Sequence, residues 1–261
     1  MIVQAEILAI GDELCYGRVY DTNSFWLADQ VTRLGVAVRR IICVRDSIEE
    51  ICAVLRDMLD RKPRFIFITG GLGPTEDDRT LEALAKLTGR KVVVDQKVLE
   101  IMAERRKIPP SQFQPRQLKM ASTLEGAECY PNPAGWAPLT ILRMGETMIS
   151  VMPGPPKEMQ SCFTTYLIKA IEDVTHYHSF AKRVVVTMFE SEVAPIISQI
   201  HKSVLGVYLK SLVGEAIPNV GLPVEIIVFD NDEGGCQRKY AETVKMLEDL
   251  VKQRGKEVRE V

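Results

Sequence analysis

The chain has 261 residues, of which 46% are hydrophobic and 26% are charged, and its formal net charge at pH 7 is -2. This composition is typical of a globular protein with a substantial core, and its charge balance argues against nucleic acid as a partner. No apolar run approaches the roughly 20 residues that span a bilayer. A strand pattern begins at the amino terminus, where a signal peptide would stand. We therefore expect a cytoplasmic protein with no membrane contact.

Ala5 to Ile10 predicts a first strand that stops at Gly11-Asp12-Glu13. Acids at the end of a parallel strand lie where open α/β sheets collect their ligands. Asp21-Thr22-Asn23-Ser24 precedes a helix predicted over 25–34, and we interpret Asp21 as its cap. Val36 to Val44 predicts a second strand, and a helix over 48–59 follows Asp46-Ser47. Asp46 therefore either caps that helix or serves a ligand.

A glycine-rich loop joins the apolar run Phe65 to Ile68, which is typical of a buried parallel strand, to a helix beginning near Leu81. Its sequence is Thr69-Gly70-Gly71-Leu72-Gly73-Pro74-Thr75-Glu76-Asp77-Asp78-Arg79-Thr80. Three glycines in four positions permit a sharp turn and let phosphate approach main-chain N–H groups, and the helix start adds free N–H groups. The alternative is a plain turn in which Thr75-x-x-Asp78 forms a capping box. Neither a P-loop nor a Rossmann fingerprint is present.

Downstream, helices are predicted over 96–106 and 112–121, and strands over 139–144 and 148–152. The turn-rich segment 129–138, which contains Trp136, is expected to form a loop over the site. Pro153-Gly154-Pro155-Pro156-Lys157-Glu158-Met159 makes a second strand-to-helix turn. Glu158 there is a candidate base or metal ligand, although an acid in a first helical turn also suits the helix dipole.

The six cysteines are scattered without Cys-x-x-Cys spacing, so we expect neither a zinc site nor a thiol redox motif, and we interpret most of them as core residues. Residues 172–182 read as an irregular linker. The element order after the linker, β-α-β-β-α-β, predicts a small ferredoxin-like module with a role in packing, dimerisation or substrate covering. We expect the chain to form a homo-oligomer.

Four blocks in order resemble the amino-terminal domain of the CinA family, a branch of the MoaB/Mog-like molybdopterin-binding superfamily. They are Gly11-Asp12-Glu13-Leu14 with Gly17 and Asp21-Thr22-Asn23, then Val44-Arg45-Asp46, Gly70 to Thr80, and Pro153 to Met159. One departure is Leu139, where CinA proteins usually have glycine. Another is the missing nicotinamide-mononucleotide deamidase domain of full-length bacterial members, so we expect no deamidation.

The resemblance implies a three-layer α/β/α domain with a mostly parallel sheet over residues 1–172, followed by a small α+β (ferredoxin-like, βαββαβ) domain over 182–261. It implies catalytic roles for Asp46 and Asp78, to which we add Glu158. Asp12, Asp46 and Asp78 are the candidate ligands of a divalent metal, Mg²⁺, Mn²⁺ or Co²⁺. The candidate substrate-binding residues are Gly11, Glu13, Asn23, Gly70, Gly71, Gly73, Pro74, Thr75, Pro153 and Gly154.

The activity implied by the resemblance is hydrolysis of ADP-ribose or a related dinucleotide by a metal-dependent pyrophosphatase. In this hypothesis the N–H groups of residues 70–75 hold the diphosphate. The alternative is a molybdopterin-binding protein of molybdenum cofactor biosynthesis, because the same loop suits either phosphate. A third reading is a nucleotide- or pterin-binding module without catalysis.

Overall fold

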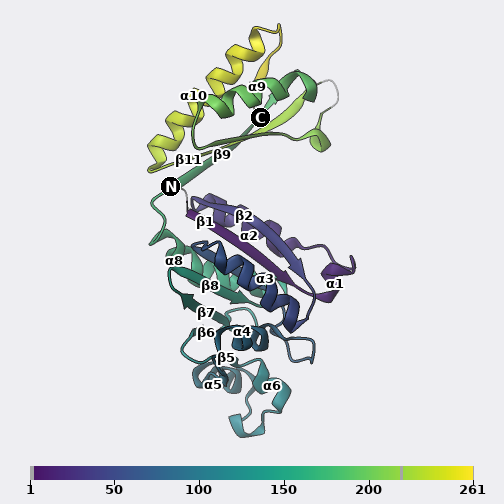
Figure 1. The fold of residues 1–261 in the computed structure, drawn as a ribbon, viewed down its shortest axis with the longest axis vertical. Coiled ribbons are helices and arrows are strands. Elements are labelled where there is room, and N and C mark those ends of the chain that lie inside the picture. Colours follow the sequence, from purple (N-terminus) through teal and green to yellow (C-terminus); the bar gives the residue numbers. More distant parts are fainter. Residues whose placement is uncertain (1–2, 218–219, 261) are drawn as a thin grey trace. The chain divides into compact units, whose positions relative to one another are not determined.

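The computed structural model describes residues 3–217 and 220–260 (Figure 1). The chain divides into two compact units. The larger comprises Val3–Val31 and Val36–Asp173, and the smaller comprises Thr32–Gly35 and the chain from Val174 onward. None of the helices in the described ranges combines the length and the apolar character that a membrane crossing requires.

The larger unit is built on a six-stranded sheet of order β2-β1-β3-β8-β7-β6. Its strands are β1 (Val3–Ile10), β2 (Val36–Val44), β3 (Phe65–Thr69), β6 (Glu128–Tyr130), β7 (Leu139–Met144) and β8 (Thr147–Met152). The first four in sheet order run parallel, whereas at one edge β7 pairs antiparallel with β8 and β6 pairs antiparallel with β7. Every residue of β3 is buried, as its continuous apolar sequence predicts.

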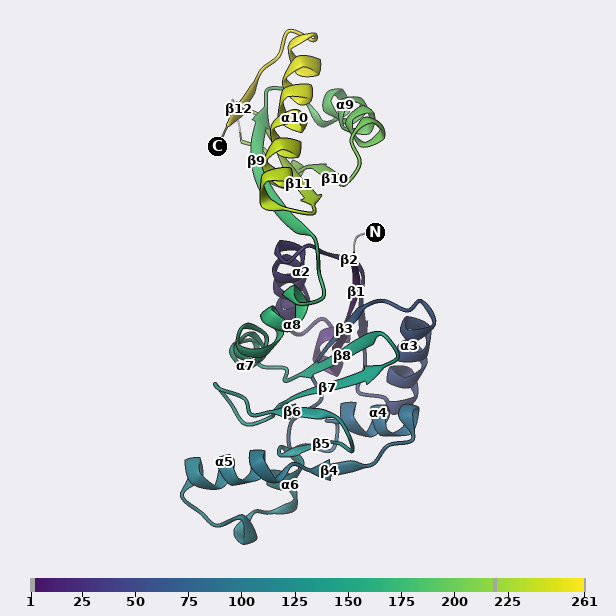
Figure 2. The ribbon, with the colours of Figure 1, turned by 90° about the vertical axis from the view of Figure 1, so that its left-hand side faces the viewer.

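Helices cover both faces of this sheet. Figure 2 shows α2 (Thr22–Arg33), α7 (Pro156–Cys162) and α8 (Ile168–Glu172) on one face, and α3 (Ile48–Asp60) with α4 (Thr80–Thr88) on the other. The predicted three-layer α/β/α architecture with a mostly parallel sheet is therefore confirmed. A one-turn helix, α1 (Asp12–Cys15), follows β1 where the sequence indicated only the end of the strand.

A small satellite follows α4. It contains β4 (Val92–Val94) paired with β5 (Ser122–Leu124), and helices α5 (Gln96–Arg106) and α6 (Pro115–Lys119), with a 3₁₀ turn at Pro110–Gln112. The helix predicted over 112–121 is too long. It begins only at Pro115, because the backbone before this proline is extended at Gln114.

One ion pair involves a carboxylate that is buried on β1. Glu6 on β1 is fully buried, and Arg61 at the end of α3 donates to both of its carboxylate oxygens, each at 2.6 Å. Arg61 also contacts Asp57 one turn earlier in the same helix. Because both carboxylate oxygens are hydrogen-bonded, the charge of Glu6 is compensated inside the core.

The smaller unit is an antiparallel sheet of order β10-β11-β9-β12, and α9 and α10 pack on its apolar face. Its elements are β9 (His178–Val186), α9 (Glu190–Ser203), β10 (Val207–Ser211), a 3₁₀ turn (Val213–Glu215), β11 (Leu222–Asp230), α10 (Glu233–Lys252) and β12 (Val258–Glu260). The predicted ferredoxin-like order is confirmed. The prediction of an irregular linker over 172–182 is wrong from His178 onward. There the chain forms β9, whose first residue, His178, pairs with Asp230 of β11.

Candidate functional site

A cavity of about 550 Å³ lies in the larger unit, at the carboxyl ends of the parallel strands. It is reached by the residues that follow β1, β3 and β8, where an open α/β sheet binds its ligands. The side chains and loops singled out from the sequence converge on this cavity, with the exception of Asp12 and Thr75. The four sequence blocks therefore meet in space, as doubly wound topology predicts.

The glycine-rich turn owes its shape to two glycines with positive φ. Gly70 has φ +99° and Gly71 has φ +67°, and both pack closely against neighbouring atoms. A Cβ atom at Gly70 would lie 2.1 Å from the carbonyl oxygen of Ile10, and one at Gly71 would lie 2.1 Å from Oγ1 of Thr80. Any other residue at these positions would force the turn away from β1 and from the start of α4.

Asp78 organises the rest of this turn. Its Oδ1 accepts the N–H of Gly73 at 2.7 Å, and its Oδ2 accepts the N–H of Thr75 at 2.8 Å and the hydroxyl of Thr75. The capping-box alternative is correct in one respect, because Thr75 and Asp78 are joined by hydrogen bonds. It is wrong about the helix, because α4 begins only at Thr80 and its cap position is Arg79. Asp78 thus holds a loop that precedes the helix.

This arrangement corrects the expected phosphate cradle of residues 70–75. The N–H of Gly70 donates to the carbonyl of Met152 at 3.1 Å, those of Gly73 and Thr75 donate to Asp78, and Pro74 has none. Within the described part of the chain, the amides of Gly71 and Leu72 are the ones in this stretch left without a partner. The anion-binding capacity of the turn is therefore limited to these two groups.

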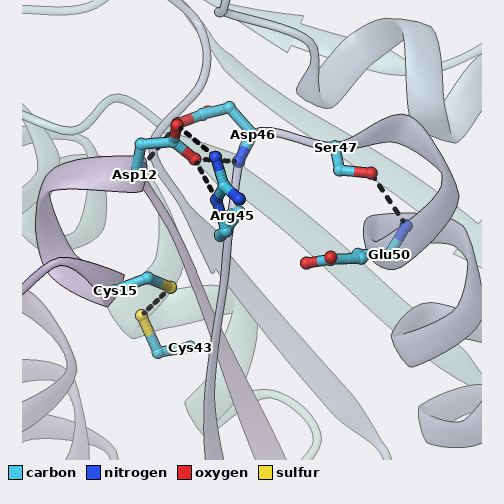
Figure 3. A network of polar contacts seen from close by, with 7 residues as sticks. All are labelled: Asp12, Cys15, Cys43, Arg45, Asp46, Ser47 and Glu50. Carbon is cyan, nitrogen blue, oxygen red and sulfur yellow. Dashed lines mark hydrogen bonds and ion pairs between the residues drawn. The ribbon is translucent and has the colours of Figure 1, made fainter.

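The second cluster of polar groups joins the ends of β1 and β2 (Figure 3). The N–H of Asp12 donates to Oδ2 of Asp46 at 2.8 Å, and the N–H of Asp46 donates to Oδ1 of Asp12 at 3.2 Å. Arg45 donates to both oxygens of Asp12, each at 3.1 Å. Ser47 caps α3 through the N–H of Glu50, so the capping interpretation of Asp46 is wrong.

The two aspartates differ in their electrostatic environment. The guanidinium of Arg45 lowers the pKa of Asp12. Burial raises the pKa of Asp46, and the charges of Asp12, Glu13 and Asp77 add to this shift. Asp46 lines the cavity, whereas Asp12 does not. Ionisation costs more free energy at Asp46 than at Asp12, because the pKa of Asp46 is raised and that of Asp12 is lowered.

The acids do not form a ready metal centre. Both oxygens of Asp12 and both oxygens of Asp78 already accept hydrogen bonds from the protein. Among the residues that the structure describes, no group of three or more His, Cys, Asp or Glu side chains is arranged to hold a metal ion. In this arrangement the donor set expected from the resemblance, Asp12, Asp46 and Asp78, does not fit a divalent cation.

Glu158 fastens the segment 131–138 against the cavity. Asn132 donates from Nδ2 to Oε2 of Glu158 at 3.3 Å and to the carbonyl of Ala137 at 3.0 Å. A Cβ atom at Gly135 would lie 2.0 Å from the carboxylate of Glu158. Burial raises the pKa of this carboxyl, and a backbone hydrogen bond from Trp136 opposes the shift.

Trp136 brings a flat aromatic surface to the cavity from this segment. The guanidinium of Arg106 lies over its ring, 4.5 Å from the centroid. Arg105 donates to the carbonyls of Asn132 and Gly135 at 3.0 and 2.9 Å. Because α5 clamps the segment in this way, its aromatic ring is positioned by a helix that the sequence reading did not connect with the site.

Asn23 supplies a buried hydrogen-bond acceptor. It lies in the first turn of α2 and is 9% exposed. Its Nδ2 donates to the carbonyl of Gly154 at 2.7 Å, which orients the amide, while its Oδ1 has no partner in the described ranges. Asp21 caps α2 as predicted by accepting the N–H of Ser24 at 2.9 Å.

Sequence reasoning missed part of the cavity wall. Leu14, Val19 and Tyr20 line it, and Tyr20 is 91% exposed. The signal available in the sequence was the placement of two apolar side chains directly before Asp21-Thr22-Asn23, which a polar surface loop does not need.

A cavity at the carboxyl ends of parallel strands, with a glycine turn, an oriented amide and an aromatic side chain, defines a small-molecule binding domain of the α/β/α class. A family model described as a probable molybdopterin binding domain matches residues 6–173. The chain belongs to this family.

Relatives in archaea support the same assignment. A protein from Metallosphaera sedula is 40% identical over 215 residues, covering 81% of this chain and 80% of its own length. A protein from Thermococcus kodakarensis is 37% identical over 262 residues, covering 94% and 96%. The crystal structure of the protein CinA with unknown function from Thermoplasma acidophilum is 31% identical, with a TM-score of 0.61, covering 65% of this chain and 98% of that one. The resemblance to the CinA family is confirmed.

Proposed function

We propose that the cavity binds a molybdopterin-type ligand, meaning a pterin ring that carries one phosphate. The observation that carries the proposal is Oδ1 of Asn23, a buried acceptor without a partner at the cavity wall. Leaving such a group unpaired costs about 1–3 kcal/mol, and an N–H group of a pterin relieves this cost. Membership in the molybdopterin-binding family supports the same ligand.

The charge of the cavity favours one phosphate over two. Glu13, Asp46, Asp77 and Glu158 line it, and these carboxylates repel a diphosphate that no cation neutralises. The same carboxylates suit a heterocycle rich in amino and N–H donors. The single phosphate is then held by the free amides at the glycine turn.

Three parts of the wall bind the ligand in this arrangement. The amides of Gly71 and Leu72 donate to the phosphate, the ring of Trp136 stacks on the pterin, and Asn23 accepts from its edge. The carbonyl of Gly154 accepts from Nδ2 of Asn23, so that Oδ1 is the atom left for the ligand. No step of this binding mode requires a metal.

Hydrolysis of ADP-ribose, the activity that the resemblance implies, stays a hypothesis with weaker support. Asp78 is hydrogen-bonded to its own loop, and Asp12 is paired with Arg45. These hydrogen bonds take up part of the acceptor capacity of both acids, and the described residues hold no group of three or more candidate ligands arranged around a metal ion. We therefore rank ligand binding above metal-dependent hydrolysis.

The proposal is tested by titrating molybdopterin, prepared under anaerobic conditions, into the protein while the tryptophan fluorescence is followed. We expect saturable quenching that is lost in Trp136→Phe and weakened about tenfold in Asn23→Ala. Asn231→Ala, in the smaller unit, is the matched control and should bind as the wild type does.

Parallel incubations contain ADP-ribose with Mg²⁺, Mn²⁺ or Co²⁺, and AMP release is measured. Release of AMP that Asp78→Asn abolishes, together with absence of molybdopterin binding, would overturn the proposal in favour of the pyrophosphatase. Binding of neither ligand would refute both functions.

A further inference from the structure

Two cysteines from distant parts of the sequence contact each other, one on α1 and the other on β2. Cys15 ends α1 and Cys43 lies near the end of β2, and their sulfur atoms are 3.5 Å apart (Figure 3). Both residues are exposed, whereas Cys52, Cys162 and Cys236 are buried. The interpretation of most cysteines as core residues therefore does not apply to this pair.

The contact is a product of the fold. Cys15 and Cys43 are separated by 28 positions, so no motif spacing marks them. α1 is set against the end of β2 by the hydrogen bonds between Asp12 and Asp46. This places the two thiols at a surface that small reagents can reach.

We propose that Cys15 and Cys43 form a reversible intramolecular disulfide. A disulfide needs sulfurs about 2.05 Å apart, so the two must approach by about 1.5 Å, which side-chain rotation of exposed residues allows. The proposal rests on the thiol contact alone and does not depend on the proposed function.

The reaction proceeds by exchange with a small-molecule disulfide such as oxidised glutathione. The thiolate of one cysteine of the pair attacks one sulfur of the reagent, a mixed disulfide forms and one glutathione thiolate leaves. The other cysteine then loses its proton, attacks the protein sulfur of the mixed disulfide and releases the second glutathione. Two protein thiols are oxidised, and one reagent disulfide is reduced to two thiols.

The surroundings of Cys43 disfavour ionisation of both thiols at the same time. Partial shielding of its sulfur from solvent, the hydrogen bond with Cys15 and the charges of Cys15, Asp21 and Glu13 raise the pKa of Cys43 to about 12. The two thiols therefore lose their protons one after the other, as the two steps of the exchange require.

The bridge would close the segment from Cys15 to Cys43, which includes the cavity-lining residues Val19 and Tyr20. Closing a loop of this length removes chain entropy from the unfolded state. We expect the melting temperature of the oxidised protein to lie about 10 °C above that of the reduced protein.

The experiment treats the full chain with oxidised glutathione, blocks the remaining thiols with an alkylating reagent, and maps tryptic peptides by mass spectrometry. We expect one linked species that joins the peptides Met1–Arg18 and Ile41–Arg45, and we expect dithiothreitol to separate them. Cys15→Ser and Cys43→Ser should each abolish this species and the gain in melting temperature. Cys129→Ser, which keeps the pair, should retain both.

Three results would overturn the inference. They are glutathione adducts on both cysteines without a link, a link between two chains in place of one within a chain, and thiols that stay free after prolonged oxidation. A linked species without any rise in melting temperature would refute the stated consequence for the loop.

Discussion

Replacing Asp78 by Asn separates two roles for this residue. In the structure Asp78 is a loop organiser, because its two oxygens accept hydrogen bonds from Gly73 and from both donors of Thr75. An asparagine keeps one of the two accepting oxygens. In place of the other oxygen it has an NH₂ group, which faces N–H or O–H donors and cannot accept from them. One side of the turn therefore loses its partner.

The magnitude follows from the bonds that are lost. Hydrogen bonds to a charged group contribute about 1.5–3 kcal/mol, and the half-buried position of Asp78 lowers this to about 1–2 kcal/mol. For a unit of this size the loss corresponds to a melting temperature lower by about 2–8 °C. Affinity for molybdopterin should fall as well, because the amides of Gly71 and Leu72 lose their fixed orientation.

The assay is thermal unfolding followed by circular dichroism, together with the fluorescence titration. Asp77→Asn is the matched control, since it removes the neighbouring charge from an exposed side chain, and it should change stability by less than about 0.5 kcal/mol. If Asp78→Asn unfolds at the wild-type temperature and binds ligand normally, the loop-organising role of Asp78 is wrong.

Two further changes test the fold and the charge of the cavity. Arg61→Ala leaves the buried carboxylate of Glu6 without its partner and should destabilise the larger unit by about 3–5 kcal/mol in urea unfolding. The control Arg40→Ala removes an exposed ion pair and should cost less than about 1 kcal/mol. Equal effects of the two changes would contradict the role of the buried pair. Burial raises the pKa of Asp46 above 3.8, so the wild type loses stability as the pH rises through the range above that value. The variant Asp46→Asn has no carboxyl group at this position, so it should be more stable than the wild type at pH 7 and equally stable at pH 3. A difference in unfolding free energy that stays constant between these pH values would refute the raised pKa of Asp46.

Much of the architecture could be predicted because it follows from local patterns. The apolar run at Phe65 predicts β3, the β-branched run Val36–Val44 coincides with β2, and Gln96–Arg106 coincides with α5. The convergence of the acids and glycines on one cavity also follows from the order of parallel strands. Boundaries failed where distant pairing decides them, as at His178, where β11 extends β9 beyond its apolar part.

The sequence by itself determined the fold class, the family resemblance and the position of the cavity, because hydrophobic periodicity and glycine turns act over short stretches of chain. Only the tertiary structure decided which polar groups remain free. Asp78 and Asp12 were predicted to face a cation and instead bond to Gly73, Thr75 and Arg45. The reason is that a carboxylate satisfies the nearest donors, and those donors are fixed by how the strands and loops pack.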